Sequence, residues 1–239
     1  MNLLFRFLPF LRHRPHLSGA QQQRIRALPV PVNAHDCLLE RARFVVLDQE
    51  TTGLNLSHDQ VISIGAVVIE QQAIDFGQLF EATLRPKKLD ISESILIHGI
   101  TPGELAAGQP PAEALLEFME FVGDSPLLAY HAPFDQQMLA RALREHLGLR
   151  LNLPFLDVAE MAPMLCPDAR LLKTGLDNWV QYFRLQVSQR HHASADALVT
   201  AEIALILLHL ARQQGISSLA SMEQRLQLWR RAQQPQHSL

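Results

Sequence analysis

The chain has 239 residues, a length that fits one full domain with extensions at its ends. Hydrophobic residues make up 48% and charged residues 19%, which excludes global disorder and indicates a globular protein with a sizeable core. The two cysteines, Cys37 and Cys166, lie far apart in the sequence, so a disulfide framework and a CxxC zinc site are excluded. A reducing cytoplasm is the expected location.

The net charge of −3 is unevenly distributed. Residues 1–43 hold seven arginines against two acidic residues, whereas residues 44–211 hold 21 acidic against 10 basic residues. An acidic centre suits a nucleic-acid binder only when bound cations neutralise part of it, and the alternative is an ordinary solvated surface. The clean apolar runs, 61–69 and 203–211, are about half of the roughly 18 residues that a spanning helix needs, so no membrane span is expected.

The pattern divides the chain into three parts. Residues 1–40 are rich in Arg, Gln, His and Pro with weak periodicity, and we interpret them as a basic extension with room for one short helix. Residues 41–213 form the predicted domain, and residues 214–239 form a C-terminal helix or tail.

Within the domain, apolar runs predict five strands, of which three precede any long helix, at 44–47, 61–69, 73–84, 126–130 and 153–156. Apolar stripes at helical spacing predict helices that start at Pro110-Pro111 and that cover 135–147, 157–165, 176–183 and 195–212. Strands followed by alternating strands and helices indicate an α/β fold with a mixed sheet between helices.

The most informative segment is Asp48-Gln49-Glu50-Thr51-Thr52-Gly53. Residues two apart on a strand point to the same face, so Asp48 and Glu50 are expected side by side at the end of an apolar strand. Such a pair stays ionised only with cations nearby, which predicts a metal site. The alternative is that each acid caps the turn that follows the strand.

Two further acids follow predicted strand and helix ends. Asp135 comes just after the fourth strand, in the first turn of a helix, and Asp196 opens the long apolar helix, with His191 five residues before it. Taken singly, both acids suit helix N-termini because the helix dipole favours a negative charge there.

With these motifs in this order, residues 43–212 resemble the DEDD superfamily of 3′–5′ exonucleases, and specifically its histidine-bearing DEDDh branch, which includes proofreading epsilon-like proteins. The segment Ile97-His98-Gly99 is also similar to a stretch typical of epsilon-like proteins. The resemblance implies a ribonuclease H-like fold with a five-stranded sheet and helices on both faces. It also implies hydrolysis of nucleic acid from the 3′ end to nucleoside 5′-monophosphates.

The same resemblance implies the roles of individual residues. Two ions of Mg²⁺ or Mn²⁺ would be held by Asp48, Glu50, Asp135 and Asp196, with Asp48 bridging them. His191 would act as general base. We favour it over His192, which lies four residues before Asp196, the spacing at which the related tyrosine branch places its catalytic tyrosine.

Substrate contacts follow from the resemblance in the same way. They are expected at Thr51, Thr52, Leu54, His98 and His131. The chain departs from the family at Tyr130-His131, where His-Asn is common. His131 therefore either faces the substrate or has a purely structural role in the core.

These features favour a DNA exonuclease that acts in proofreading or repair on single-stranded or frayed 3′ ends. Two alternatives remain open at this point, an RNA 3′-trimming exoribonuclease, because the same site serves both polymers, and a catalytically inert accessory module of a polymerase complex. A polymerase or a sliding clamp is a candidate partner, because residues 224–229 resemble a short clamp-docking peptide, although their spacing also fits an amphipathic helix on the domain.

Overall fold

The computed structural model describes residues 15–35, 37–87, 99–187 and 192–234, and its centre is a five-stranded mixed sheet. The strands lie in the order β3-β2-β1-β4-β5, with bounds β1 Phe44–Thr51, β2 Val61–Glu70, β3 Ala73–Thr83, β4 Leu127–Ala129 and β5 Phe155–Asp157. β1, β2 and β3 are antiparallel neighbours, whereas β4 runs parallel to β1, and β5 parallel to β4. The expected mixed sheet is therefore confirmed.

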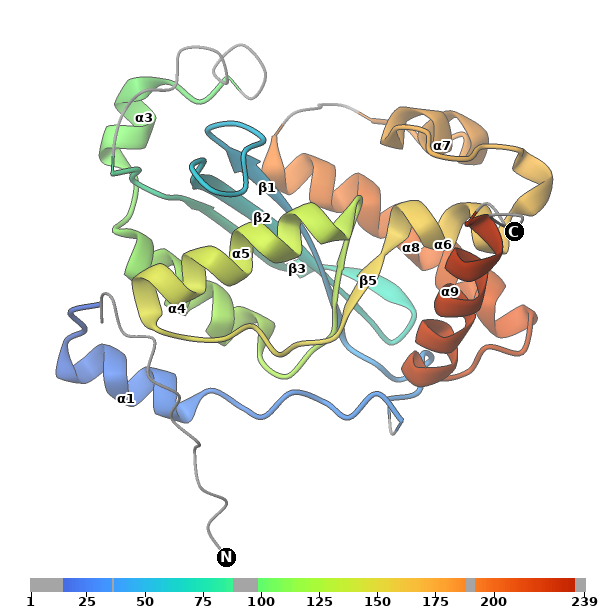
Figure 1. Cartoon of the computed structure of the whole chain (residues 1–239), viewed down its shortest axis with the longest axis horizontal. Coiled ribbons are helices and arrows are strands. Elements are labelled where there is room, and N and C mark those ends of the chain that lie inside the picture. Colours follow the sequence, from blue (N-terminus) through green and yellow to red (C-terminus); the bar gives the residue numbers. More distant parts are fainter. Residues whose placement is uncertain (1–14, 36, 88–98, 188–191, 235–239) are drawn as a thin grey trace, which may run out of the picture.

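Helices cover both faces of this sheet (Figure 1). One apolar cluster joins Val45 and Leu47 of β1 to α4 (Pro111–Val122) and α5 (Ala132–Leu147). The other joins Phe44 and Val46 to a second set of helices, which are α6 Val158–Leu165, α7 Leu176–Phe183, α8 Ala193–Gln213 and α9 Leu219–Gln233. Strand β1 is thus buried on both faces, as its continuous apolar run predicts.

The short helices were the least predictable elements. The helix α3 (Pro102–Ala107) begins at a capping box, in which the Thr101 hydroxyl accepts the N–H of Glu104. A 3₁₀ turn, η1 (Pro167–Ala169), follows α6. Both have too few residues to produce a helical stripe in the sequence, and neither was predicted.

The described segment before the domain lies against it. Arg24 of helix α1 (Gly19–Ala27) forms ion pairs with Glu113 and Glu120 of α4, and Cys37 and Leu39 are buried in the core. The one short helix allowed for in this segment is therefore present. The boundary at residue 40 remains a prediction.

Helix α8 is the central helix of the face opposite α4 and α5. Among the described residues it is the one helix long and apolar enough to cross a membrane, but eleven of its 21 residues are buried in the protein. It packs along β1 and β2, so the requirements of the core account for its apolar character.

Gly65 of β2 allows α8 to approach the sheet closely. A Cβ atom on Gly65 would lie 2.1 Å from the backbone nitrogen of Ser194 and 2.2 Å from the carbonyl carbon of Ala193. Side chains do not approach backbone atoms this closely, so only glycine fits between β2 and the first turn of α8.

We expect Gly65→Ala to lower the free energy of unfolding by about 1–3 kcal/mol, because the added methyl group must push the helix backbone away. Gly19→Ala is the matched control, since Gly19 is the first residue of α1 and a Cβ there meets nothing within 4 Å. This control should be neutral or slightly stabilising. Urea unfolding followed by circular dichroism measures both, and equal effects of the two substitutions would contradict the proposed contact.

Candidate active site

The first two acids of the site lie at the carboxyl end of β1. Asp48 and Glu50 share the face of Phe44 and Val46, which is the face covered by α8. Strand β1 continues through Thr51, four residues beyond the predicted strand, so both acids belong to the regular strand rather than to a turn. In the ladder, Asp48 pairs with Gly65.

The third acid reaches the same place from α8. Asp196 lies in the first turn of α8 and is 6% exposed. One carboxylate oxygen from each of Asp48, Glu50 and Asp196 can be chosen so that all three lie within 4.8 Å of one another. Since Gly65 both pairs with Asp48 and contacts the backbone beside Ser194, the close packing of α8 on β2 brings these carboxylates together.

These three carboxylates fit a divalent cation. Carboxylate oxygens are hard ligands that suit Mg²⁺, Mn²⁺ or Ca²⁺ rather than soft metals. The grouping joins β1 and α8, two elements far apart in the sequence, at the end of a buried strand. The residues present therefore match the divalent-metal dependence that the exonuclease family implies.

The fourth predicted acid, Asp135, lies beside this group but is not part of it. Strand β4 ends at Ala129, and the first turn of α5 brings Asp135 close to β1, where it is 5% exposed. The amide Nε2 of Gln49 donates to the backbone oxygen of Asp135 at 3.1 Å. Gln49 thus ties α5 to the strand segment that carries Asp48 and Glu50.

Burial raises the pKa of Asp135 well above the ordinary value of an aspartate. The nearby carboxylates of Asp157 and Glu50 also raise this pKa, whereas backbone hydrogen bonds at Asp135 and Gln49 oppose the rise. A bound cation favours the ionised form of such a carboxyl group, so Asp135 is suited to support a metal ion from the α5 side.

Asp157 is a buried acid of this region that the sequence analysis did not single out. It ends β5, and its Oδ1 accepts the backbone N–H of Ala159, which caps α6, and the backbone N–H of His131 at 3.1 Å. Burial raises the pKa of Asp157. The sequence pattern predicts Asp157 as the first residue of the helix 157–165, whereas in the structure it ends β5 and caps α6. Its place between a predicted strand and a predicted helix was the signal that could have identified it.

His131 takes the left-handed conformation, with φ of 62°, at the start of α5. Its side chain is exposed, and its ring lies edge-on to Tyr130 at 4.8 Å. Tyr130 in turn donates its hydroxyl to the backbone oxygen of Thr174. Of the two alternatives for His131, a role within the core is therefore wrong, while substrate contact remains a prediction.

The two adjacent histidines before α8 differ in what the structure describes. His191 and His98 lie outside the described residues. His192 precedes the first residue of α8, where its Nδ1 lies 3.0 Å from the Ser194 hydroxyl and its Nε2 lies 3.5 Å from Glu81 of β3.

The remaining predicted contact residues belong to the end of β1 and the loop that follows it. Thr51 and Thr52 are half-buried, whereas the side chain of Leu54 is 83% exposed. The Thr51 hydroxyl donates to the backbone oxygen of Gly53, and the Thr52 hydroxyl donates to Asp59. Leu54 is therefore the member of this trio whose side chain faces solvent, and substrate contact by all three residues remains a prediction.

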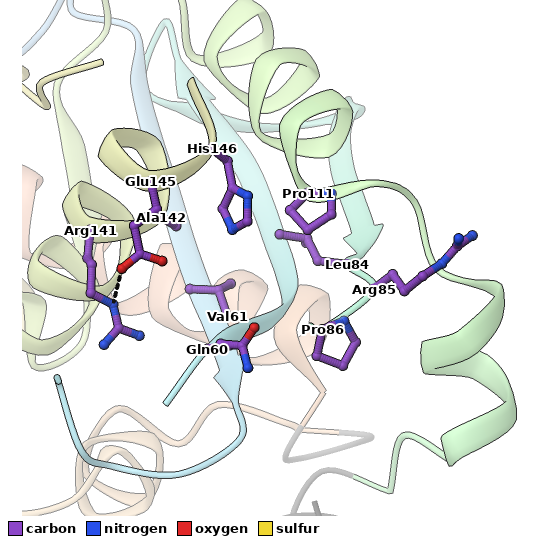
Figure 2. Close-up of a pocket in the computed structure, with 10 residues that line it drawn as sticks. All are labelled: Gln60, Val61, Leu84, Arg85, Pro86, Pro111, Arg141, Ala142, Glu145 and His146. Carbon is purple, nitrogen blue, oxygen red and sulfur yellow. Dashed lines mark ion pairs between the residues drawn. The ribbon is translucent and has the colours of Figure 1, made fainter. Parts of the chain in front are cut away.

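A separate pocket lies between the start of β2, the end of β3 and the C-terminal half of α5 (Figure 2). Its lining includes Gln60, His146 and Arg141, which pairs with Glu145. It contains none of the predicted site residues. Its relevance to the site is indirect, because Arg141 also donates to the backbone oxygen of Leu56 in the loop after β1.

Comparison with known proteins identifies the family. The model of the RNase T exonuclease family matches residues 45–204, a range that includes all four predicted acids. Among curated relatives, PolC-type DNA polymerase III of Thermotoga maritima is 34% identical over 183 residues, and that of Bacillus subtilis is 31% identical over 191 residues. These alignments cover 76% and 79% of this chain but only 13% of each polymerase.

Solved structures support the same fold. Escherichia coli exonuclease I in its complex with single-stranded DNA superposes with a TM-score of 0.61 and 21% sequence identity, over 74% of this chain and 42% of that chain. A second structure of this enzyme, with a dT13 oligonucleotide, also gives 0.61, at 18% identity and over 73% and 42% of the two chains. From the family match and the resemblance of its motifs, we conclude that the chain belongs to the exonuclease family and is a DEDD-type nuclease with a ribonuclease H-like fold.

Proposed function

We propose that the protein is a 3′–5′ exonuclease that hydrolyses DNA to nucleoside 5′-monophosphates in proofreading or repair. The observation that carries the proposal is the convergence of the Asp48, Glu50 and Asp196 carboxylates within 4.8 Å in a chain of the exonuclease family. An inert accessory module would have no need of this arrangement, because converging carboxylate oxygens are the ligands that divalent cations such as Mg²⁺ prefer.

In this proposal Asp48, Glu50 and Asp196 hold divalent ions, either Mg²⁺ or Mn²⁺, and Asp135 supports a second ion from α5. Such ions, when bound, lower the pKa of the attacking water and stabilise charge on the leaving oxygen. The protein's own part is to fix the four carboxylates, which come from β1, α5 and α8.

We assign the general base to His191, which would take the proton of the attacking water. The contacts of its neighbour support this assignment, since the ring of His192 lies against Ser194 and Glu81. Both ring nitrogens of His192 have polar neighbours, so accepting a proton from the attacking water would cost it one of these contacts.

DNA is the proposed polymer because the relatives include PolC-type DNA polymerases and the structural neighbours bind single-stranded DNA. Single-stranded or frayed 3′ ends would be the form that enters the site, with His98 and His131 among its contacts. A cytoplasmic location fits this use. RNA is the competing substrate, and the first experiment below separates the two.

A polymerase is a candidate partner because the similar regions of the relatives belong to much longer DNA polymerases. Docking on a sliding clamp through residues 224–229 has less support, because these residues lie within α9 and Leu226 is only 2% exposed. Trp229 packs against the core, and Arg230 pairs with Glu160 of α6. Binding as an extended peptide would require α9 to unwind.

The activity is tested with 5′-labelled single-stranded DNA, a duplex with a 3′ mismatch, and single-stranded RNA of the same sequence. We expect stepwise shortening of the DNA substrates in Mg²⁺, release of mononucleotides, and complete loss of activity in chelator. A circular single strand is the control and should remain intact. Cleavage of the circle, full activity in chelator, or a strong preference for RNA would contradict the proposal.

The metal site is tested by thermal unfolding of Asp48→Asn with and without Mg²⁺. Wild type should gain stability on addition of Mg²⁺, because a ligand that binds only the folded state shifts the equilibrium by mass action. The variant should gain much less, while Asp168→Asn, at an exposed residue in η1, should behave like wild type. An equal gain in Asp48→Asn and wild type would show that Asp48 is not a ligand.

The general base is tested by comparing His191→Ala with His192→Ala. Loss of a general base should lower kcat by roughly 10²–10⁴-fold, while the Mg²⁺-dependent stabilisation is retained. His192→Ala should have a much smaller effect on kcat. The reverse order of the two variants would assign the base to His192.

A further inference from the structure

The loop between β1 and β2, residues 52–60, is exposed at its tip yet internally bonded. Asp59 is half-buried at its centre, where Oδ1 accepts the Thr52 hydroxyl at 2.9 Å and Oδ2 accepts the backbone N–H of Asn55 at 2.7 Å. One carboxylate therefore joins the two sides of the loop.

The sequence of the loop accommodates this carboxylate. A Cβ atom on Gly53 would lie 2.6 Å from Oδ2 of Asp59, so glycine is needed for the carboxylate to reach Asn55. The base of the loop is closed by two bonds between Thr52 and Gln60, backbone N–H to backbone oxygen at 2.9 Å and backbone N–H to the Thr52 hydroxyl at 3.0 Å. From outside, Arg141 of α5 donates to the backbone oxygen of Leu56.

These bonds determine what the loop presents to a ligand. A threonine hydroxyl carries a single proton, and those of Thr51 and Thr52 are donated to Gly53 and Asp59 within the loop. The side chain of Leu54 is then the group left to contact a ligand, and it is 83% exposed. Leu54 lies between Thr52 and Asn55, the two residues that donate to Asp59. An exposed leucine on a braced loop loses little conformational freedom when a ligand packs against it.

We propose that Asp59 is a positioning residue, which holds Leu54 as a fixed apolar surface for the base of the terminal nucleotide. This inference rests on the proposed nuclease function and extends it to substrate selection. An apolar contact with the face of a base does not read its hydrogen-bonding edge, so the loop accepts any base at the 3′ end. Asp59 acts through Leu54 and touches neither the substrate nor the metal ligands.

The test is a double-mutant cycle with Asp59→Ala, Leu54→Ala and the variant that carries both. Each single variant should raise KM for a short single-stranded DNA about tenfold with little change in kcat, because the carboxylates of the site are untouched. The double variant should be no worse than Leu54→Ala alone, since Asp59 acts through Leu54. Independent, multiplying effects on KM would overturn the proposal.

Asp75→Ala is the matched control, because Asp75 braces a different segment by accepting the backbone N–H of Gly77 and the side-chain amide of Gln78. It pairs with Val68, far along β2 from the loop before Val61, so its KM should equal that of wild type. A rise in KM as large as that of Asp59→Ala would mean that the effect is one of general stability.

A second readout does not depend on nuclease activity. Hydrogen exchange at the Asn55 amide should be slow in wild type and fast in Asp59→Ala, because Asp59 accepts that N–H. Unchanged exchange would overturn the bracing role of Asp59 even if KM rose. If wild type showed no nuclease activity, the proposed function would fail, and equilibrium binding of a fluorescent oligonucleotide in Ca²⁺ would replace KM in the same cycle.

Discussion

The contact between Gly65 and the first turn of α8 is the constraint on which the site depends. Because glycine has no side chain, the backbone at Ala193 and Ser194 lies directly on β2, beside the residue that pairs with Asp48. Asp196 lies in this same first turn and so reaches the carboxylates of β1. The buried apolar length of α8 holds this arrangement, since its contacts along β1 and β2 keep the helix pressed on the sheet. A core helix thereby fixes the position of a charged group at its end.

The other side of the site depends on the short length of β4. This strand ends at Ala129 and only two residues separate it from α5, so α5 takes the place beside β1 that a longer strand would occupy. Gln49 then binds the backbone of Asp135, while Asp157 binds the backbone of His131. Gln49, on the face of β1 opposite Asp48 and Glu50, thus holds α5, and the acids on the first face meet α8. Because successive side chains of β1 point to opposite faces of the sheet, this one strand connects both α5 and α8 to the group of carboxylates.

Much of this arrangement is readable from the sequence for a physical reason. The apolar runs give the strands and helices, and two-residue alternation alone places Asp48 and Glu50 on one face. The contacts that complete the site are not readable in this way. Gly65 looks like any glycine in a strand, and Gln49 signals its role only as a polar residue in a position that alternation assigns to the core. Asp157 accepts the backbone N–H of His131, which the tertiary fold places beside it, and such a partner leaves no local pattern. Asp59 accepts an N–H only four residues away in its own loop, but aspartate is common in loops and the residue type alone does not indicate this bond.

The account is tested most directly by a crystal structure of the protein with Mn²⁺ and a deoxynucleoside 5′-monophosphate, using the anomalous signal of manganese. We expect manganese between Asp48, Glu50 and Asp196, with Asp135 on its α5 side and the nucleotide phosphate against the metal. We also expect α8 to remain in contact with Gly65. Manganese bound elsewhere, or bound without Asp196, would contradict the claim that the packing of α8 on β2 builds a nuclease site.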